Sequence, residues 1–286
     1  MREGSGRPSV TPHWLAYTSR PTREKLAERF GEKARQALPF LAKWSPGAHA
    51  CTPAPRREKR IKLQLCGFLA ILPLGTANNI ARSLGVEGEA EVLLDCIRKR
   101  ITKTLDVGLV SGGPWKKRRV VEGVGVGLLA NWMYGASSKP PAHERTQKGR
   151  ELLREALLKA VPRHWSLNID GHELSQEFLL IEVLNTRFIG PALPMGPSSA
   201  PGNRLLDIVY LLPPARSEML SWLDNPHRTP SPLLVRQGRK IILNWEHGPL
   251  HIDDRSWERP DKNAQVTIRL APECLQVCAP LPHKEQ

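Results

Sequence analysis

The chain has 286 residues, of which 40% are hydrophobic, so it is long and apolar enough to bury a sizeable core, and disorder throughout is excluded. Its formal net charge is +14 and its pI is about 9.9, which favours anionic partners such as nucleotides, nucleic acid or acidic lipid headgroups. The first 65 residues hold 14 Lys or Arg against 5 Asp or Glu, a net charge of +9. We interpret this basic quarter as a solvated arm rather than a binding surface.

Residues 1–60 form a separate segment in our interpretation. Hydrophobic side chains recur every four residues over 22–38, which predicts a helix there. Residues 45–60 are rich in Pro and Arg, a composition typical of a linker. We therefore predict a divergent basic segment and linker over 1–60 that packs poorly, ahead of an ordered body.

Cysteine usage and hydropathy indicate the compartment. None of the five cysteines forms a C-x-x-C pair and their spacings match no zinc pattern, so we expect reduced thiols in a cytosol. The longest apolar stretch, 65–74, is shorter than the ~20 residues that span a bilayer. No apolar region follows the N-terminal charges, so we expect no signal peptide. We predict a cytoplasmic protein whose contact with the inner membrane surface is peripheral, with no transmembrane segment.

An α/β pattern follows the linker. Residues 62–72 read as a buried strand, and a glycine turn then leads into a helix that begins near Ile80 and ends at Gly85. A second helix is expected over 87–100. The order strand, glycine turn, helix, helix predicts α/β organisation over 61–105.

Short β segments dominate from residue 104 onward and predict a β-rich, sandwich-like second domain over 106–286, with the extreme C-terminus returning to the first domain. Asp170-Gly171 is a hairpin-turn signal between two of these segments. One amphipathic helix, over 149–161, interrupts them, and we interpret its apolar face as core-facing. A cleft between two such parts is a common place for a ligand. The expected strands are 104–110, 118–130, 164–170, 177–185, 205–212, 239–245, 250–254 and 264–270.

Two polar clusters admit a structural or a functional interpretation. Residues 116–119 are four consecutive cations, and we expect an exposed loop between two strands there. His247 and His251, with Asp253 nearby, have a metal-like spacing, but Gly248 and its following proline break any helix between them. On a strand, His251 and Asp253 share one face, and we predict that this face is solvated.

The strongest local signal is the segment LPLGTANN at 72–79. Gly75 permits a tight turn, Thr76 offers a hydroxyl, and Asn78 or Asn79 is suited to cap the helix that follows. A helix N-terminus with free N–H groups attracts phosphate. On physical grounds alone, a phosphate-facing turn and a well-made turn without a ligand explain this segment equally well.

Five segments in the same order resemble the diacylglycerol kinase catalytic domain family, which includes bacterial lipid kinases and sphingosine kinases. The first is LPLGTANNIARSLG, which is similar to the P-L-G-T-x-N-D segment of that family. It is followed by TLDVGLV and by VEGVGVGLLANWM, in which close packing needs the small residues Gly123, Gly125 and Gly127. Residues 178–211 and HIDD at 251–254 complete a colinear match over 62–278, which is more specific than any single motif.

This resemblance implies a two-domain lipid kinase architecture with the active site between an α/β nucleotide-binding domain, of which 61–105 is the remnant, and a β-rich domain. It also implies that the γ-phosphate of ATP is transferred to a lipid hydroxyl such as that of diacylglycerol, with Mg²⁺ neutralising charge and a carboxylate accepting the proton. Carried over position by position, the resemblance assigns nucleotide binding to Gly75, Thr76, Asn78 and Asn79, metal binding to Asp207 and Asp253, and the catalytic role to Asp254.

The chain departs from the family at several acids. The Gly-Gly-Asp-Gly-Thr phosphate loop of the family is absent from the sequence, and Asn79, Ser198 and Asn203-Arg204 stand where the family has acidic residues or an acidic-Gly pair. In a strict alignment Arg255 replaces the base, whereas a shift by one residue gives Asp254. Each lost carboxylate weakens a Mg²⁺ site. We therefore expect little or no lipid kinase activity, even if the chain folds like a kinase.

The missing phosphate loop has two explanations: a shifted or misassigned reading frame upstream of codon 62, or divergence to a non-catalytic relative. The sequence thus leaves an ATP-dependent lipid kinase and a catalytically inactive lipid- or nucleotide-binding relative as alternatives. A basic nucleic-acid-binding protein is a third alternative, which charge favours but no recognised nucleic-acid-binding motif supports. An NAD kinase, which shares the general domain plan, fits the GTANN segment and the Gly- and Pro-rich middle less well.

Overall fold

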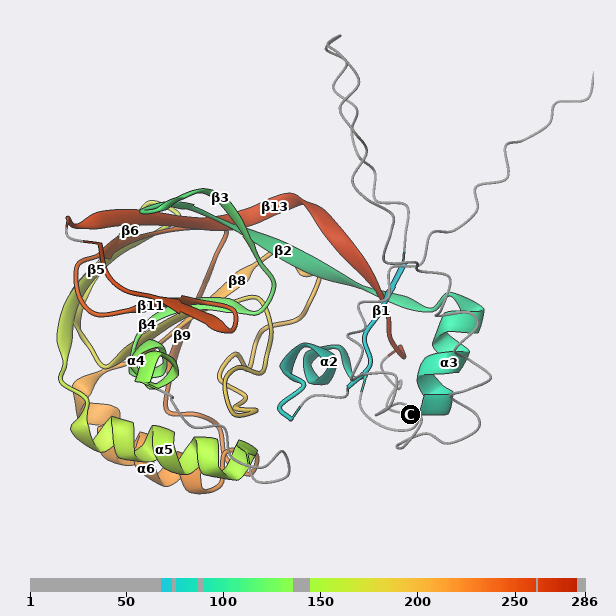
Figure 1. The fold of residues 1–286 in the computed structure, drawn as a ribbon, viewed down its shortest axis with the longest axis horizontal. Coiled ribbons are helices and arrows are strands. Elements are labelled where there is room, and N and C mark those ends of the chain that lie inside the picture. The colour runs from blue at the N-terminus through green and yellow to red at the C-terminus, as the bar shows by residue number, and fades with distance from the viewer. Residues whose placement is uncertain (1–67, 74–75, 87–89, 136–144, 261, 282–286) are drawn as a thin grey trace, which may run out of the picture.

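The computed structural model describes residues 68–73, 76–86, 90–135, 145–260 and 262–281, which form a mixed α/β fold rich in strands. Two β-sheets lie one above the other, and helices cover the outer face of one sheet (Figure 1). The predictions made for residues 1–60 and for Gly75 lie outside the described residues.

Sheet A has seven strands in the order β3-β2-β13-β10-β5-β6, with β1 paired in parallel to the end of β13. The long strands β2 and β13 pair with each other and continue beyond the two stacked sheets to the region of β1, α2 and α3 (Figure 1). The strands are β1 (Phe68–Ala70), β2 (Thr102–Gly112), β3 (Trp115–Val120), β5 (Arg163–Ile169), β6 (His172–Phe178), β10 (Lys240–Trp245) and β13 (Ala264–Cys278).

Sheet B has six antiparallel strands in the order β12-β11-β4-β7-β8-β9. Its residues alternate between the two faces, so that Val124 and Val126 of β4 pack toward sheet A while Leu180 and Leu184 of β7 pack toward the helices. The strands are β4 (Gly123–Gly127), β7 (Leu180–Leu184), β8 (Leu206–Leu211), β9 (Leu234–Gly238), β11 (Leu250–Ile252) and β12 (Arg255–Trp257).

The helices fall into two groups. Three of them, α4 (Leu128–Gly135), α5 (Arg145–Lys159) and α6 (Arg216–Asp224), the last preceded by a short 3-10 turn η1 (Pro213–Ala215), cover sheet B, while α2 (Asn79–Leu84) and α3 (Ala90–Lys99) lie beside β1 (Figure 1). Three main apolar cores result: one between the sheets, one between sheet B and its helices, and one around α2, α3 and β1. Among the described residues, no helix is long and apolar enough to cross a membrane.

Several sequence predictions are confirmed. Gly85 ends α2 in the left-handed conformation, with φ of 71° and its N–H donated to the last turn of the helix. Asp170 and Gly171, with φ of 49° and 97°, form the two-residue turn between β5 and β6. The helix predicted over 149–161 is α5, whose Leu153 and Leu157 are fully buried against sheet B.

Other predictions are wrong in local detail. The strand expected over 118–130 is three elements: β3, β4 and the beginning of α4. Gly127 has φ of 83°, which ends the strand, and apolar residues then continue as helix. The cations 116–119 lie within β3, an edge strand of sheet A, rather than in a loop. The strand expected over 177–185 is split at Leu179 between β6 and β7.

Candidate functional site: a carboxylate cluster at one end of sheet B

The predicted nucleotide-binding turn leads into α2. Thr76 lies in the bend before the helix, and Asn78 is the N-cap residue, in the left-handed conformation with φ of 51°. The prediction that Asn78 caps the helix through its side chain is wrong, because its Nδ2 donates 3.2 Å to the Pro73 carbonyl and no side-chain cap bond forms. The helix has six residues.

Asn79 connects this turn to the second half of the chain. Its Nδ2 donates to Glu122 Oε1 at 2.5 Å and to the Gly190 carbonyl at 3.1 Å. Its Oδ1 is buried and has no hydrogen-bond partner among the described residues. A buried amide oxygen without a donor is uncommon, and it is an available ligand for a hard cation.

Asp253 and Asp254 form the two-residue turn between β11 and β12. The Asp253 carboxylate accepts backbone N–H bonds from three consecutive residues, Val121 at 3.1 Å, Glu122 at 2.8 Å and Gly123 at 3.3 Å. Burial raises the pKa of Asp253, and these three bonds offset part of that rise. Asp253 thus holds the start of β4 in place, whereas Asp254 is exposed to solvent.

Glu122 lies between Asn79 and this turn, and the sequence analysis missed it. Burial raises the pKa of Glu122 to about 7; the hydrogen bond from Asn79 lowers it and the charges of Asp253 and Asp254 raise it. A carboxylate whose pKa is near neutrality is a common feature of functional sites. The signal in the sequence was a single acid between two runs of valine and glycine. We call Glu122, Asp253 and Asp254 the carboxylate cluster.

Asp207 lies at the same end of sheet B but apart from the carboxylate cluster. Asp207, Leu184, Gly123 and Asp253 form one row across β8, β7, β4 and the end of β11. Three steps between neighbouring strands, at ~4.8 Å each, put the backbone positions of Asp207 and Asp253 about 14 Å apart. The Asp207 carboxylate is buried and accepts hydrogen bonds from Ser199 and Gln237, both at 2.8 Å.

A buried Glu–His pair lies two residues further along β4. Glu182 Oε2 and His251 Nε2 are 2.7 Å apart, both side chains are 0% exposed, and Gly125 of β4 lies between them. The prediction that His251 lies on a solvated face is therefore wrong: α4 packs against β11 and covers that face. His251 Nδ1 donates to the Asp253 carbonyl at 3.1 Å, so the pair supports the turn of the carboxylate cluster.

The electrostatics of this pair follow from its burial. Burial raises the pKa of Glu182, which His251 opposes. Burial alone would lower the pKa of His251, but Glu182 outweighs it and the pKa lies above its ordinary value. The pair therefore retains a proton to higher pH than either group does in water. Glu182 Oε1 has no hydrogen-bond partner in the part of the chain that the structure describes, and a buried oxygen of this kind is uncommon.

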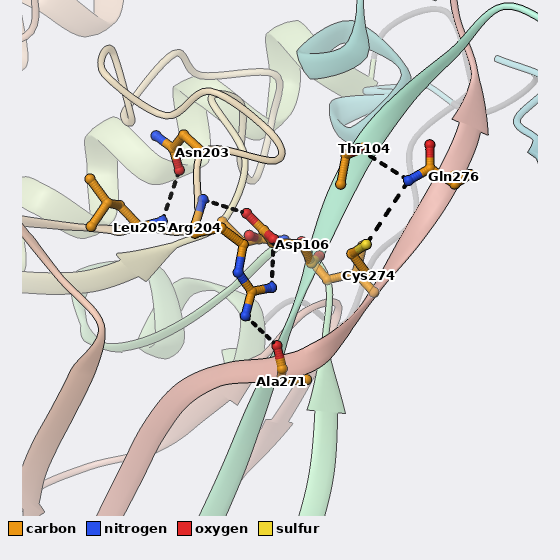
Figure 2. A network of polar contacts seen from close by, with 10 residues as sticks. Thr104, Asp106, Asn203, Arg204, Leu205, Ala271, Cys274 and Gln276 are labelled. Atoms are coloured by element: carbon orange, nitrogen blue, oxygen red, sulfur yellow. Dashed lines mark hydrogen bonds and ion pairs between the residues drawn. The ribbon is translucent and has the colours of Figure 1, made fainter. Parts of the chain in front are cut away.

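A further buried carboxylate, Asp106, contacts the chain at Asn203-Arg204, where it departs from the family. Asp106 of β2 is 1% exposed, and Arg204 donates to it twice at 2.9 Å, from its backbone N–H and from its guanidinium (Figure 2). The guanidinium also donates to the Ala271 carbonyl of β13 at 2.7 Å. Arg204 has φ of 61°, which suits the glycine that the resemblance expects at this position. This ion pair connects the 203–205 turn to the long strands β2 and β13.

The described residues contain no group of three or more His, Cys, Asp or Glu placed to hold a metal ion together. Mg²⁺ does not require such a cage, since it is usually bound by one or two carboxylates together with substrate phosphates. Glu122 beside the unpartnered Asn79 Oδ1 fits this pattern. The sequence predicted Asp207 and Asp253 as metal ligands. The carboxylate oxygens of both residues accept hydrogen bonds from donors of the protein instead.

The fold is that of a class of bacterial proteins known from crystal structures. A "putative diacylglycerol kinase" from Bacillus anthracis str. Sterne is 17% identical, with a TM-score of 0.59 over 76% of this chain and 70% of that chain. A further structure of a diacylglycerol kinase from the same organism is 18% identical, with a TM-score of 0.58 over 76% and 71%. At this identity the likeness concerns the fold.

A family model also matches part of the sequence. Residues 65–110 match the diacylglycerol kinase catalytic domain, so the resemblance to that family is confirmed over the turn, α2, α3 and most of β2. No curated protein matches the chain.

Proposed function

We propose that this chain is an ATP-dependent lipid kinase of reduced activity, which phosphorylates a lipid hydroxyl such as that of diacylglycerol. The observation that carries this proposal is the hydrogen bond between Asn79 and Glu122. It joins the turn predicted to bind nucleotide to the carboxylate cluster, although Asn79 and Asp253 are far apart in the sequence. Two parts of a phosphotransfer site are thereby adjacent.

Each group has a role that its surroundings support. We propose that Gly75, Thr76 and Asn78 bind the phosphates of ATP. Glu122 with Asn79 Oδ1 would hold Mg²⁺, which would neutralise phosphate charge when bound. Asp254 is the exposed carboxylate of the cluster, and we assign it the role of accepting the proton of the lipid hydroxyl. As that proton leaves, the lipid oxygen bonds to the γ-phosphorus, and the bond between the γ-phosphorus and the β,γ-bridging oxygen breaks.

The lipid reaches this site from a membrane surface, so we propose a peripheral association with the cytoplasmic face of the membrane. The net positive charge of the chain supports attraction to anionic lipid headgroups.

The test is transfer of labelled γ-phosphate from ATP to diacylglycerol or a sphingoid base in detergent micelles with Mg²⁺. We expect slow turnover that falls by ~10²–10⁴-fold in Asp254→Asn, the usual range for loss of a general base. Asp224→Asn is the matched control, because Asp224 is an exposed residue of α6. Turnover that Asp254→Asn leaves unchanged would remove Asp254 from the mechanism.

A catalytically inactive relative that binds nucleotide or lipid is the second candidate. Two observations favour it. The Asp253 carboxylate already accepts hydrogen bonds from three backbone N–H groups, and Arg255, directly after the turn, stands at the position of the base in a strict alignment. In this case Mg-ATP binds, as measured by calorimetry, and no phosphate is transferred to any lipid tested. Absence of both binding and transfer would contradict the two candidates together.

A further inference from the structure

A pocket of about 550 Å³ opens at the other end of β4 from the carboxylate cluster. Gly127 is at the pocket and Gly123 is beside Asp253, so β4 separates the two by about 13 Å at ~3.3 Å per residue. The pocket lies between α4, the C-terminal end of α5, the start of β5 and the turn after β10. It is therefore a site separate from the one proposed for phosphotransfer.

Positive charge dominates the lining of this pocket. Lys159, Arg163 and Arg259 line it, against the single carboxylate of Glu246. Neither Lys159 nor Arg163 has an ion-pair partner among the described residues, and Arg259 makes one long hydrogen bond, 3.4 Å to Asn263. Unpaired cations that converge on one concave surface favour an anionic ligand.

Part of the pocket lining is apolar, beside the polar residues Asn131 and His247. Leu128, Trp132, Ala156, Leu179 and Trp165 contribute to it. At its mouth Val161 is 63% exposed, and the neighbouring Leu158 is 55% exposed. A pocket with an apolar wall and a cationic mouth matches an amphiphile that carries an apolar chain and an anionic head.

Two buried donors belong to residues that line this pocket. The indole Nε1 atoms of Trp132 and Trp165 are buried and have no hydrogen-bond partner among the described residues, and Trp165 as a whole is 2% exposed. Buried donors of this kind are uncommon in folded proteins.

Arg216 hydrogen-bonds the C-terminal end of α5, so the cations of the pocket are not needed there. Arg216 donates from Nη1 to the Leu157 carbonyl at 2.6 Å and from Nη2 to the Ala160 carbonyl at 2.7 Å. These bonds satisfy the terminal carbonyls of the helix, a task that Lys159 would otherwise perform. The wall is thus fixed before a ligand arrives.

We propose that this pocket binds a single-chain amphiphile with a phosphate or carboxylate head, whose chain lies along the wall of Trp132 and Leu128 and whose head lies among Lys159, Arg163 and Arg259. The proposal does not depend on kinase activity, because none of these residues belongs to the carboxylate cluster.

Calorimetry of the full chain with dodecyl phosphate below its micellar concentration tests the proposal. We expect saturable binding, at least ~10-fold tighter than that of inorganic phosphate, which lacks the chain, and of dodecylphosphocholine, which lacks the net charge. Equal binding of inorganic phosphate would contradict the apolar wall. Equal binding of dodecylphosphocholine would contradict the cationic mouth, and absence of dodecyl phosphate binding would overturn the site.

Variants locate the binding. Lys159→Gln with Arg163→Gln is expected to weaken dodecyl phosphate at least ~10-fold, since two charge-assisted contacts are lost. Both side chains are exposed, so the fold is retained. Lys116→Gln with Lys117→Gln removes the same charge from β3 and is expected to leave binding unchanged, as is Asp254→Asn. A similar loss in both double variants would show attraction to net charge alone and would overturn the site.

Discussion

The two ends of sheet B differ in charge and in how well their polar groups are bonded. At the start of β4, the Asp253 carboxylate accepts hydrogen bonds from three backbone N–H groups, and the Glu122 carboxylate accepts one from Asn79. These two acidic groups are therefore held in fixed positions. At the end of β4, Lys159 and Arg163 have no ion-pair partner, and two indole N–H groups no acceptor, among the residues that the structure describes. Fixed carboxylates suit chemistry that needs positioned groups, whereas unpaired cations suit binding of an anion from solution.

The short strand β4 connects these two ends. At its centre, Gly125 leaves no room for a larger side chain. A Cβ atom at Gly125 would lie 2.0 Å from Glu182 Oε2, too close for any side chain. We expect Gly125→Val to destabilise the fold by ~3 kcal/mol or more, because it breaks the Glu182–His251 pair as well as overpacking the sheet. Chemical denaturation measures the loss.

Gly135→Ala is the matched control for this substitution. Gly135 ends α4, and apart from its own helix and chain neighbours no atom of the described residues lies within 4 Å of the position that its Cβ would take. The free energy of unfolding of this variant is expected to stay within ~0.5 kcal/mol of the native value. Equal losses in the two variants would mean that close packing at β4 is not the cause.

The Glu182–His251 pair supplies the next effect. We expect Glu182→Leu to destabilise the chain by about 3 kcal/mol, because it leaves His251 buried without its partner. The double variant Glu182→Leu with His251→Leu is expected to recover part of this loss. If the double variant loses the sum of the two single effects, the pair is not coupled and does not support the Asp253 turn.

The raised pKa of Glu122 leads us to expect a smaller change in the free energy of unfolding, which depends on pH. Its pKa is raised from 4.5 to about 7, so between these pH values the folded chain binds a proton that the unfolded chain has lost. Stability contributed by this group is therefore full below pH 4.5 and falls as pH rises through 7, by about 2 kcal/mol after allowance for its partial exposure.

Glu122→Gln tests this sign. The variant is expected to lose less stability than the native chain between pH 4.5 and 7, in denaturant titrations at several pH values. Glu155→Gln, at an exposed position on α5, is expected to keep the native slope. A steeper fall in Glu122→Gln than in the native chain would show that the pKa of Glu122 is not raised.

The sequence predicted most elements because their signals are local. Gly85 and Asp170-Gly171 ended elements where expected, and the four-residue spacing of Leu153 and Leu157 placed α5 on the core. It failed at 118–130, where apolar residues fit a strand and a helix equally and only the positive φ of Gly127 separates them.

The site was less predictable because its contacts join distant segments. Glu122 carried no motif, and its importance comes from Asn79 and Asp253, which the fold brings to it. His251 alternates like a solvated strand residue, but a helix from elsewhere in the chain covers it. Asp207 was assigned to the metal from the resemblance alone, and the row across sheet B puts it about 14 Å from Asp253.

Binding of ATP with and without Mg²⁺, measured by calorimetry on the native chain, Glu122→Gln and Asp207→Asn, tests the central claim most directly. If Glu122 with Asn79 forms the metal-binding end of the site, Mg²⁺ strengthens ATP binding by ~10-fold or more in the native chain and in Asp207→Asn, and this gain is lost in Glu122→Gln. A gain that survives in Glu122→Gln and is lost in Asp207→Asn would contradict the account.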